Sequence, residues 1–215
     1  MKDKPNEWVA ISDLMAGVLA VVMLMLAVVV LQRKFAEAQH QRDLAALDTI
    51  SGSPVTELLK KVQNTLGEQG ASHLISVDVP SRRITLRDGV FAQGSACVTS
   101  TAAIAVGAVE EQVGRFLRDN PSGRIFVEGY TDNAPVKRPV IDYVRFCTVY
   151  DDNYTLSAAR SREARKAMLG TLEATLARRI VVAGYGDSRP LPNISPSDSR
   201  NRRVEVLFTM DGTSD

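Results

Sequence analysis

The chain has 215 residues, 45% of them apolar, and its 26 basic and 25 acidic residues leave a net charge of +1. This balance excludes a protein whose overall charge attracts nucleic acid. Two cysteines are too few for a disulfide-rich scaffold or for a zinc site made of cysteines alone. One stretch departs from the average composition, because 20 of the 23 residues from Val9 to Leu31 are apolar.

The apolar stretch predicts a membrane span. At ~1.5 Å per residue, a helix over 9–31 is about 34 Å long, which is enough to cross a hydrocarbon core of ~30 Å. The run is too long for a cleavable signal peptide, and no small-residue cleavage site follows it. We therefore predict a single transmembrane helix over 9–31. The positive residues that flank it do not favour a cytoplasmic N-terminus by themselves.

Asp13 is the one charged residue of this segment and lies about 6–7 Å along a helix that starts at Val9. A carboxylate in a membrane helix costs ~2–3 kcal/mol near the bilayer centre and less towards an end. Its position leaves two interpretations open. The carboxylate either reaches the interface or is a protonatable group that faces a partner helix or a pore. Gly17 and Ala20 share its helix face, and small residues there would let another helix approach.

The remaining sequence predicts a helical linker and then one α+β domain. Residues 32–50 lack glycine and proline and continue the helix, and Val55–Leu66 has apolar residues at helical spacing, so that 32–70 form the linker. In the domain over 71–215 we expect strands over 74–79, 83–86, 124–129, 179–183 and 203–208 and helices over 99–117 and 156–176. Strands that alternate with two long helices predict a two-layer domain.

The segment 132–154 lies between a strand and a helix and exceeds the usual loop length, so we expect it to be functional or locally structured. It contains Cys147, which could form a disulfide with Cys97 if the domain is periplasmic, or both could be free thiols. A disulfide between them would close a loop of about 50 residues and stabilise the fold by roughly 4 kcal/mol. It would also hold the segment beside the helix over 99–117.

The sequence has no P-loop, HExxH or GxSxG motif, so we predict neither an enzyme nor a metal or cofactor site. Polar residues instead gather where predicted elements end. Asp132 follows a strand, Arg160 lies in the first turns of a helix, and Asn201 and Arg202 open the last strand. A carboxylate and a guanidinium in one cleft can bind the ammonium and the carboxylate of a zwitterion. The alternative is a surface ion pair with strand-end caps.

Residues 84–209 resemble the OmpA-type peptidoglycan-binding domain. The resemblance rests on four stretches, which are Gly129–Asn133, Asn153–Arg160, Gly184–Gly186 and Asn201–Glu205. It implies a mixed β-sheet with helices on one face and a site for the diaminopimelate of the peptidoglycan stem peptide. The positions that match the family's site are Asp132, Arg160, Thr131, Asn153, Leu156, Ser157, Asn201 and Arg202. Tyr130 replaces the family's usual histidine.

Joined to one N-terminal span, this domain resembles the B subunit of MotB-type stators, and Trp8–Met15 maps the family's ion-carrying carboxyl onto Asp13. The runs Ile11–Gly17 and Gly94–Cys97 are more similar to ZorB, the B subunit of Zorya anti-phage defence. The resemblance implies an inner-membrane homodimer inside a ring of multi-span MotA- or ZorA-like subunits. It also implies a cytoplasmic N-terminus over 1–8, a periplasmic domain, and peptidoglycan and protons as ligands. A flagellar stator and a passive wall tether without ion transport are the alternatives.

Overall fold

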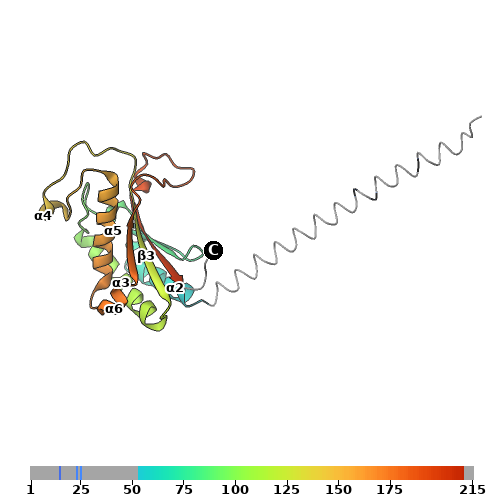
Figure 1. Cartoon of the computed structure of the whole chain (residues 1–215). Coiled ribbons are helices and arrows are strands. Elements are labelled where there is room, and N and C mark those ends of the chain that lie inside the picture. Colours follow the sequence, from blue (N-terminus) through green and yellow to red (C-terminus); the bar gives the residue numbers. More distant parts are fainter. Residues whose placement is uncertain (1–14, 16–22, 24, 26–52, 211–215) are drawn as a thin grey trace, which may run out of the picture. The chain divides into compact units, whose positions relative to one another are not determined.

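The computed structural model describes residues 53–210 together with Met15, Met23 and Met25 (Figure 1). The chain divides into two compact units, Met1–Ser51 and Gly52–Asp215. The predictions for Asp13, for the span over 9–31 and for the first part of the linker fall outside the described residues. Within the described part of the chain, no helix is both long and apolar enough to cross a membrane.

The second unit is an α+β domain built on one five-stranded mixed sheet. Its helices are α2 (Pro54–Glu68), α3 (Ser100–Asp119), α4 (Tyr143–Phe146), α5 (Asn153–Leu169) and α6 (Ala174–Ala177). Its strands are β1 (Ile75–Asp78), β2 (Arg83–Leu86), β3 (Gly123–Tyr130), β4 (Ile180–Gly184) and β5 (Arg203–Met210). Short 3-10 turns lie at η1 (Ala71–His73), η2 (Asp88–Val90) and η3 (Ser199–Asn201).

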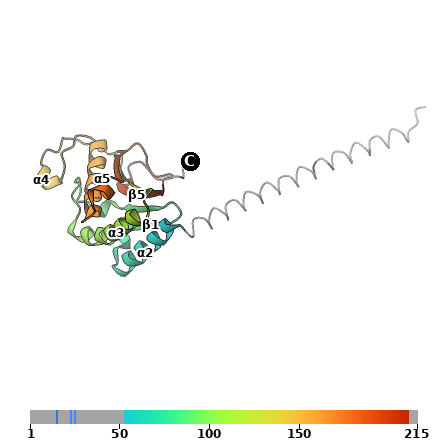
Figure 2. The same cartoon turned by 60° about the horizontal axis from the view of Figure 1, so that its bottom comes forward.

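The strands follow the order β1-β2-β5-β3-β4, in which β3 and β4 are parallel and the other neighbours are antiparallel. The helices α2, α3 and α5 cover one face of this sheet, as Figure 2 shows. The prediction of a mixed sheet with helices on one face is therefore confirmed.

Alternate residues of the central strands form the core. Val204, Val206 and Phe208 of β5 are fully buried, and so are Ile125 and Val127 of β3. A strand points successive side chains to opposite faces, so this period of two directs one face of the sheet towards the helices. The buried residues of α3 recur at helical spacing and meet that face; they include Ala102, Ala105, Val106, Val109, Val113 and Phe116.

Helix α2 belongs to the same core. Ser53 caps it, because the Thr56 N–H donates to Ser53 Oγ at 3.2 Å, and Pro54 opens the first turn. Its apolar face is buried against the domain through Val55, Leu58, Leu59, Val62 and Leu66. The end of the segment assigned to the linker is thus part of the domain's hydrophobic core, because an amphipathic helix buries its apolar stripe on the apolar surface next to it.

The prediction of one helix over 156–176 is wrong. Helix α5 ends at Leu169, and a separate short helix, α6, follows. Gly170 stops α5 with φ +44 and ψ −118, a backbone conformation that residues with a Cβ rarely adopt. A single glycine within an otherwise helical pattern is tolerated in many helices, so the pattern did not predict this break.

Two glycines let α5 approach the sheet closely. A Cβ on Gly129 of β3 would lie 2.1 Å from the Ser157 carbonyl oxygen, and one on Gly184 of β4 would lie 2.5 Å from the Ala158 nitrogen. Ser161 Oγ donates to the Ala183 carbonyl at 3.0 Å across the same contact. Because these glycines have no side chain, the first turns of α5 can lie directly against β3 and β4.

We expect Gly129→Ala to lower the free energy of unfolding by about 1–3 kcal/mol, because the added methyl group must push α5 away from β3. Chemical denaturation of the purified full chain, followed by circular dichroism, measures the loss. Gly67→Ala is the control, since a Cβ there meets nothing within 4 Å and stability should stay unchanged or rise slightly. A Gly129 variant as stable as the wild type would show that α5 does not depend on this contact.

Candidate binding site

A cavity of about 620 Å³ lies where the end of β3, the start of α5 and the residue before β5 meet. Its volume is typical of small-molecule sites, which span ~300–1,000 Å³. Five of the eight positions predicted for peptidoglycan binding line it, namely Asp132, Asn153, Leu156, Arg160 and Arg202. The fold therefore collects, from three distant parts of the chain, the residues that the sequence motifs single out.

Helix α5 supplies one side of the cavity. Asn153, Leu156 and Arg160 are three and four residues apart, so they share one face of the helix. Asp152 is the N-cap of this helix, and its Oδ1 accepts from the Thr155 N–H at 2.6 Å. That hydrogen bond lowers the pKa of Asp152, so the cap stays ionised. The N-cap and the helical spacing together direct these three side chains into the cavity.

Arg202 lies between two carboxylates. Its Nε and Nη2 donate to the two oxygens of Asp88 at 2.9 and 2.7 Å, and its Nη1 donates to Asp132 Oδ2 at 2.5 Å. The hydrogen bonds that Arg202 donates, most strongly those to Asp88 and then the one to Asp132, raise its pKa above the usual range. The two-pronged pairing with Asp88 fixes the plane of the guanidinium and thereby orients Asp132.

The sequence analysis missed Asp88. It follows β2 as Asp132 follows β3, and the two strands are separated only by β5 in the sheet. The signal that selected Asp132, an acidic residue directly beyond a strand, was therefore also present at Asp88. What the sequence could not supply was the strand order that brings both acids to Arg202.

Arg160 is a buried cation, with 2% of its surface exposed. Its Nε donates to the Ser95 carbonyl at 3.0 Å, and its guanidinium carbon lies 5.6 Å from the centre of the Phe91 ring. Burial lowers the pKa of Arg160, and the charge of Asp88 opposes that shift. Within residues 53–210 no carboxylate forms an ion pair with Arg160, and its terminal nitrogens have no hydrogen-bond partner. Such a group is suited to bind an incoming carboxylate.

Asp132 is largely buried but keeps acceptor capacity. Its Oδ2 is bound to Arg202, while its Oδ1 accepts only from the Ala134 N–H, at 3.3 Å. Asn153 Nδ2 donates to the carbonyls of Asp132 and Ala134 at 3.3 and 3.0 Å and so fixes this turn. The carboxylate can therefore accept from an ammonium group while Arg160 binds a carboxylate of the same ligand.

Ser157, Asn201 and Thr131 do not line the cavity. Ser157 Oγ accepts from the Gly186 N–H at 2.9 Å, and Asn201 Oδ1 accepts from the Leu191 N–H at 2.8 Å. The Thr131 N–H donates to the Gly186 carbonyl at 2.8 Å, while its buried Oγ1 has no partner in the described part of the chain. These side chains and backbone groups hold the loop between β4 and β5 in place, and that loop in turn positions Arg202.

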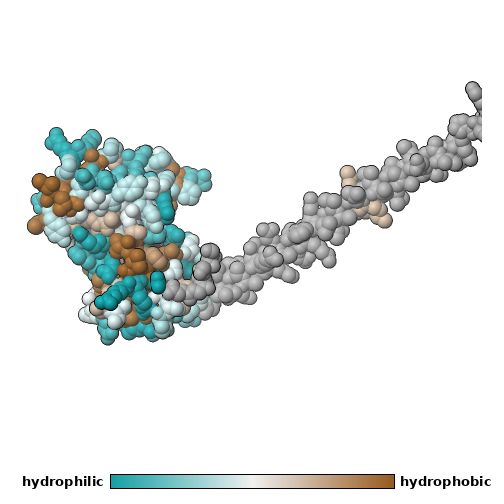
Figure 3. All heavy atoms as spheres, viewed as in Figure 1, coloured by the Kyte–Doolittle hydropathy of each residue, from teal (hydrophilic) through white to brown (hydrophobic). Residues whose placement is uncertain are grey.

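Residues 133–152, here called the insert, form a second side of the cavity and are locally structured. Val140 and Tyr150 exchange backbone hydrogen bonds of 2.8 and 3.0 Å, which closes the insert into a hairpin with α4 near its tip. The tip exposes Ile141, Tyr143 and Val144. Figure 3 shows a brown, hydrophobic surface on the side where α4 lies in Figure 1. The insert thus projects as a defined element, with its base at the cavity.

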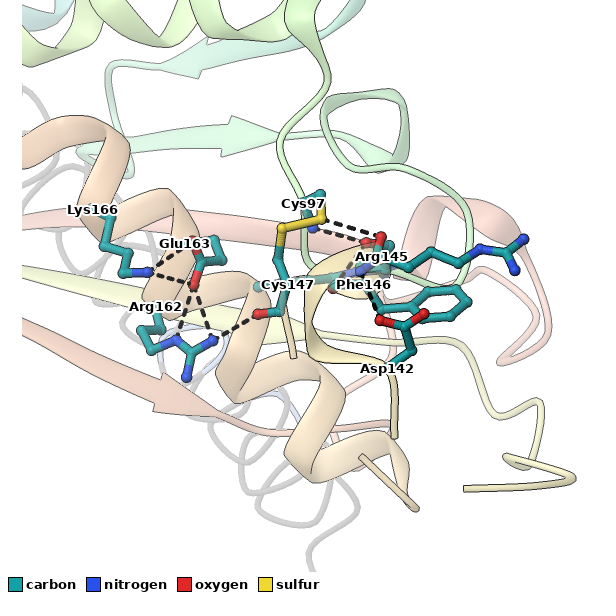
Figure 4. Close-up of a disulfide and its surroundings, with 10 residues drawn as sticks. Cys97, Asp142, Arg145, Phe146, Cys147, Arg162, Glu163 and Lys166 are labelled. Atoms are coloured by element: carbon teal, nitrogen blue, oxygen red, sulfur yellow. Dashed lines mark hydrogen bonds and ion pairs between the residues drawn. A yellow bond between two sulfur atoms is a disulfide. The ribbon is translucent and has the colours of Figure 1, made fainter. Parts of the chain in front are cut away.

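A disulfide joins Cys97 and Cys147 and ties the insert to the loop before α3 (Figure 4). Of the two alternatives that the sequence left open, the structure therefore has the disulfide and not the free thiols. Beside it, Ser95 Oγ donates to the Phe146 carbonyl at 2.9 Å. Arg162 of α5 donates through Nη2 to the Cys147 carbonyl at 2.8 Å. The disulfide and these bonds fasten the turn whose Ser95 carbonyl holds the Arg160 guanidinium.

The sequence matches the OmpA family over residues 90–203, which are 114 of its 215 residues. It is 22% identical over 159 residues to Motility protein B of Bacillus subtilis (strain 168), a match that covers 72% of this chain and 56% of that protein. The chain thus spans little more than half of that relative.

Two solved structures share the fold. A MotB-like protein from Desulfovibrio vulgaris superposes with a TM-score of 0.57 at 21% identity, covering 77% of this chain and 99% of the other. The cell wall anchor of the T6SS from Pseudomonas aeruginosa gives a TM-score of 0.51 at 24% identity, covering 69% and 96%.

We expect the double change Cys97→Ser and Cys147→Ser to destabilise the domain by roughly 4 kcal/mol, the chain-entropy value for a loop of about 50 residues. Thermal unfolding of the full chain, with and without reductant, measures the effect. Reductant should lower the Tm of the wild type to that of the double variant and leave the double variant unchanged. A wild type whose Tm ignores reductant would contradict a stabilising role for the bond.

Proposed function

The chain belongs to the OmpA family, and from this we propose that its domain binds peptidoglycan through Asp132 and Arg160. The observation that carries the proposal is the pairing of an acceptor on Asp132 with an unpaired, buried guanidinium on Arg160 in one cavity. Family membership also agrees with the prediction that the chain is not an enzyme. Binding, and not chemical turnover, is therefore the role that we assign to the site.

The ligand that fits is the free end of diaminopimelate in the stem peptide. That end carries an ammonium and a carboxylate on one carbon, so its charges match Asp132 and Arg160 in sign. Arg202 orients Asp132 through a hydrogen bond, and Asp88 holds Arg202 in turn. A lysine at the same place in the peptide would offer the ammonium alone, leaving the buried Arg160 uncompensated, which is costly.

We expect Asp132→Ala to weaken binding to isolated sacculi about 10- to 100-fold, because a charge-assisted hydrogen bond contributes ~1.5–3 kcal/mol. Arg160→Lys should also weaken it, since lysine keeps the charge but lacks the planar fork. Co-sedimentation of the full chain with sacculi measures both. Glu68→Ala, which removes an exposed carboxylate on α2, is the control and should bind as the wild type does. Undiminished binding by folded Asp132→Ala protein would remove this residue from the site.

For the whole chain we propose the role of an ion-conducting B subunit of an inner-membrane stator. The similarity to Motility protein B and the apolar segment 9–31 with its single carboxylate support this role. In it, a homodimer sits inside a ring of multi-span MotA- or ZorA-like subunits, with cytoplasmic N-termini and periplasmic domains. Each proton that crosses through Asp13 under 100 mV releases ~2.3 kcal/mol, which the ring converts to motion. Attachment to the wall resists the torque.

We expect Asp13→Asn to abolish proton flux through the complex while leaving its assembly intact, because the amide cannot take up and release a proton. Flux into vesicles that contain the chain and its multi-span partner measures this. Ser12→Ala, a neutral change next to it, is the control and should conduct. Flux that survives Asp13→Asn would overturn the mechanism, and a wild type that binds wall but never conducts would favour the passive tether.

Between the two stator classes, we propose the Zorya defence system on the runs Ile11–Gly17 and Gly94–Cys97. Deletion of the gene should then remove resistance to phage and leave swimming intact. Loss of swimming with unchanged resistance would assign the chain to the flagellar class.

A further inference from the structure

The cavity holds more positive than negative charge. Its charged lining residues are the cations Lys137, Arg138, Arg160 and Arg202 and the carboxylates Asp88 and Asp132. Both carboxylates are bound to Arg202. Three cations are therefore left without an ion-pair partner within residues 53–210, and a bound zwitterion brings only one carboxylate, which Arg160 takes.

Two of these cations lie on the insert. Lys137 and Arg138 are exposed side chains at the cavity, and neither has a hydrogen bond or ion pair in the described part of the chain. We propose that they form a second acid-binding subsite, which takes a further carboxylate of the bound peptide beside the zwitterion. This inference rests on the proposed binding of the stem peptide and adds a specificity determinant to it.

The insert can hold such a subsite because it is fastened on both sides of the pair. The Asn133 N–H donates to the Pro196 carbonyl at 3.1 Å at one end. At the other end the Tyr150 hydroxyl donates to the Gly94 carbonyl at 2.6 Å, and both residues line the cavity. Burial raises the pKa of Tyr150, which keeps this donor protonated. The insert is thus bonded at one end to the loop that contains Pro196 and at the other end to the loop that contains Gly94.

The local sequence also restricts the pair. Lys137 and Arg138 stand between Pro135 and Pro139, whose rings fix φ near −65° and limit the backbone of the residues before them. Val140, two residues further on, is the start of the hairpin pairing. A short run held between two prolines and next to this backbone pairing loses less conformational freedom when a ligand binds than an open loop does.

A solvent-exposed ion pair adds little affinity, so we expect a modest effect of about 3- to 10-fold. The probes are two synthetic tripeptides that end in diaminopimelate and have glutamate in the middle. In one, the free carboxylate of the glutamate is intact; in the other it is a carboxamide. Calorimetric titration of the full chain should give tighter binding of the acid form by that factor.

The double variant Lys137→Gln with Arg138→Gln should bind both tripeptides equally, with the affinity that the wild type has for the carboxamide. The matched control Lys60→Gln with Arg178→Gln removes two exposed cations that do not line the cavity, and it should keep the preference. A wild type that binds both forms equally, or a Lys137 and Arg138 variant that keeps the preference, would overturn the subsite alone. If the wild type binds neither form, or Asp132→Ala binds both undiminished, the proposed function fails and the subsite with it.

Discussion

Arg160 is a buried guanidinium with no carboxylate partner among residues 53–210, and the domain is arranged around this constraint. Removing a cation from water is expensive unless it is compensated. The fold gives Arg160 one carbonyl, from Ser95, and the ring of Phe91, and leaves its terminal nitrogens for a ligand. Gly129 brings α5 down to the sheet so that Arg160 reaches this position. Packing in the core and recognition at the surface therefore depend on the same contact.

The sequence predicted five of the residues that line the cavity and also selected three that do not line it. Asp132 and Arg160 were recognised by residue type and by their place at element ends, and both line the cavity. Ser157 and Asn201 belong to the same motifs, yet their side chains bond to backbone groups of the loop between β4 and β5. A motif records which residue types occur together, and side chains that hold a loop are as much a part of it as those that face a ligand.

The fold was predicted well where periodicity decides and poorly where tertiary context does. Strand β2 begins and ends where its pattern predicted, since alternation depends on adjacent residues alone. The sequence predicted the apolar face of α2, but helical periodicity alone does not show that this face packs into the core of the domain. Asp88 joined the site because antiparallel pairing places β5 between β2 and β3, and strand order is a property of the whole sheet.

The disulfide between Cys97 and Cys147 affects when the binding site is completed. Such bonds persist in oxidising compartments and are rare in the cytosol. In the periplasmic location proposed above, this bond forms only after export, and before it forms the turn that holds Arg160 lacks its covalent support. On this proposed route, the binding site gains its covalent support only after the domain has been exported.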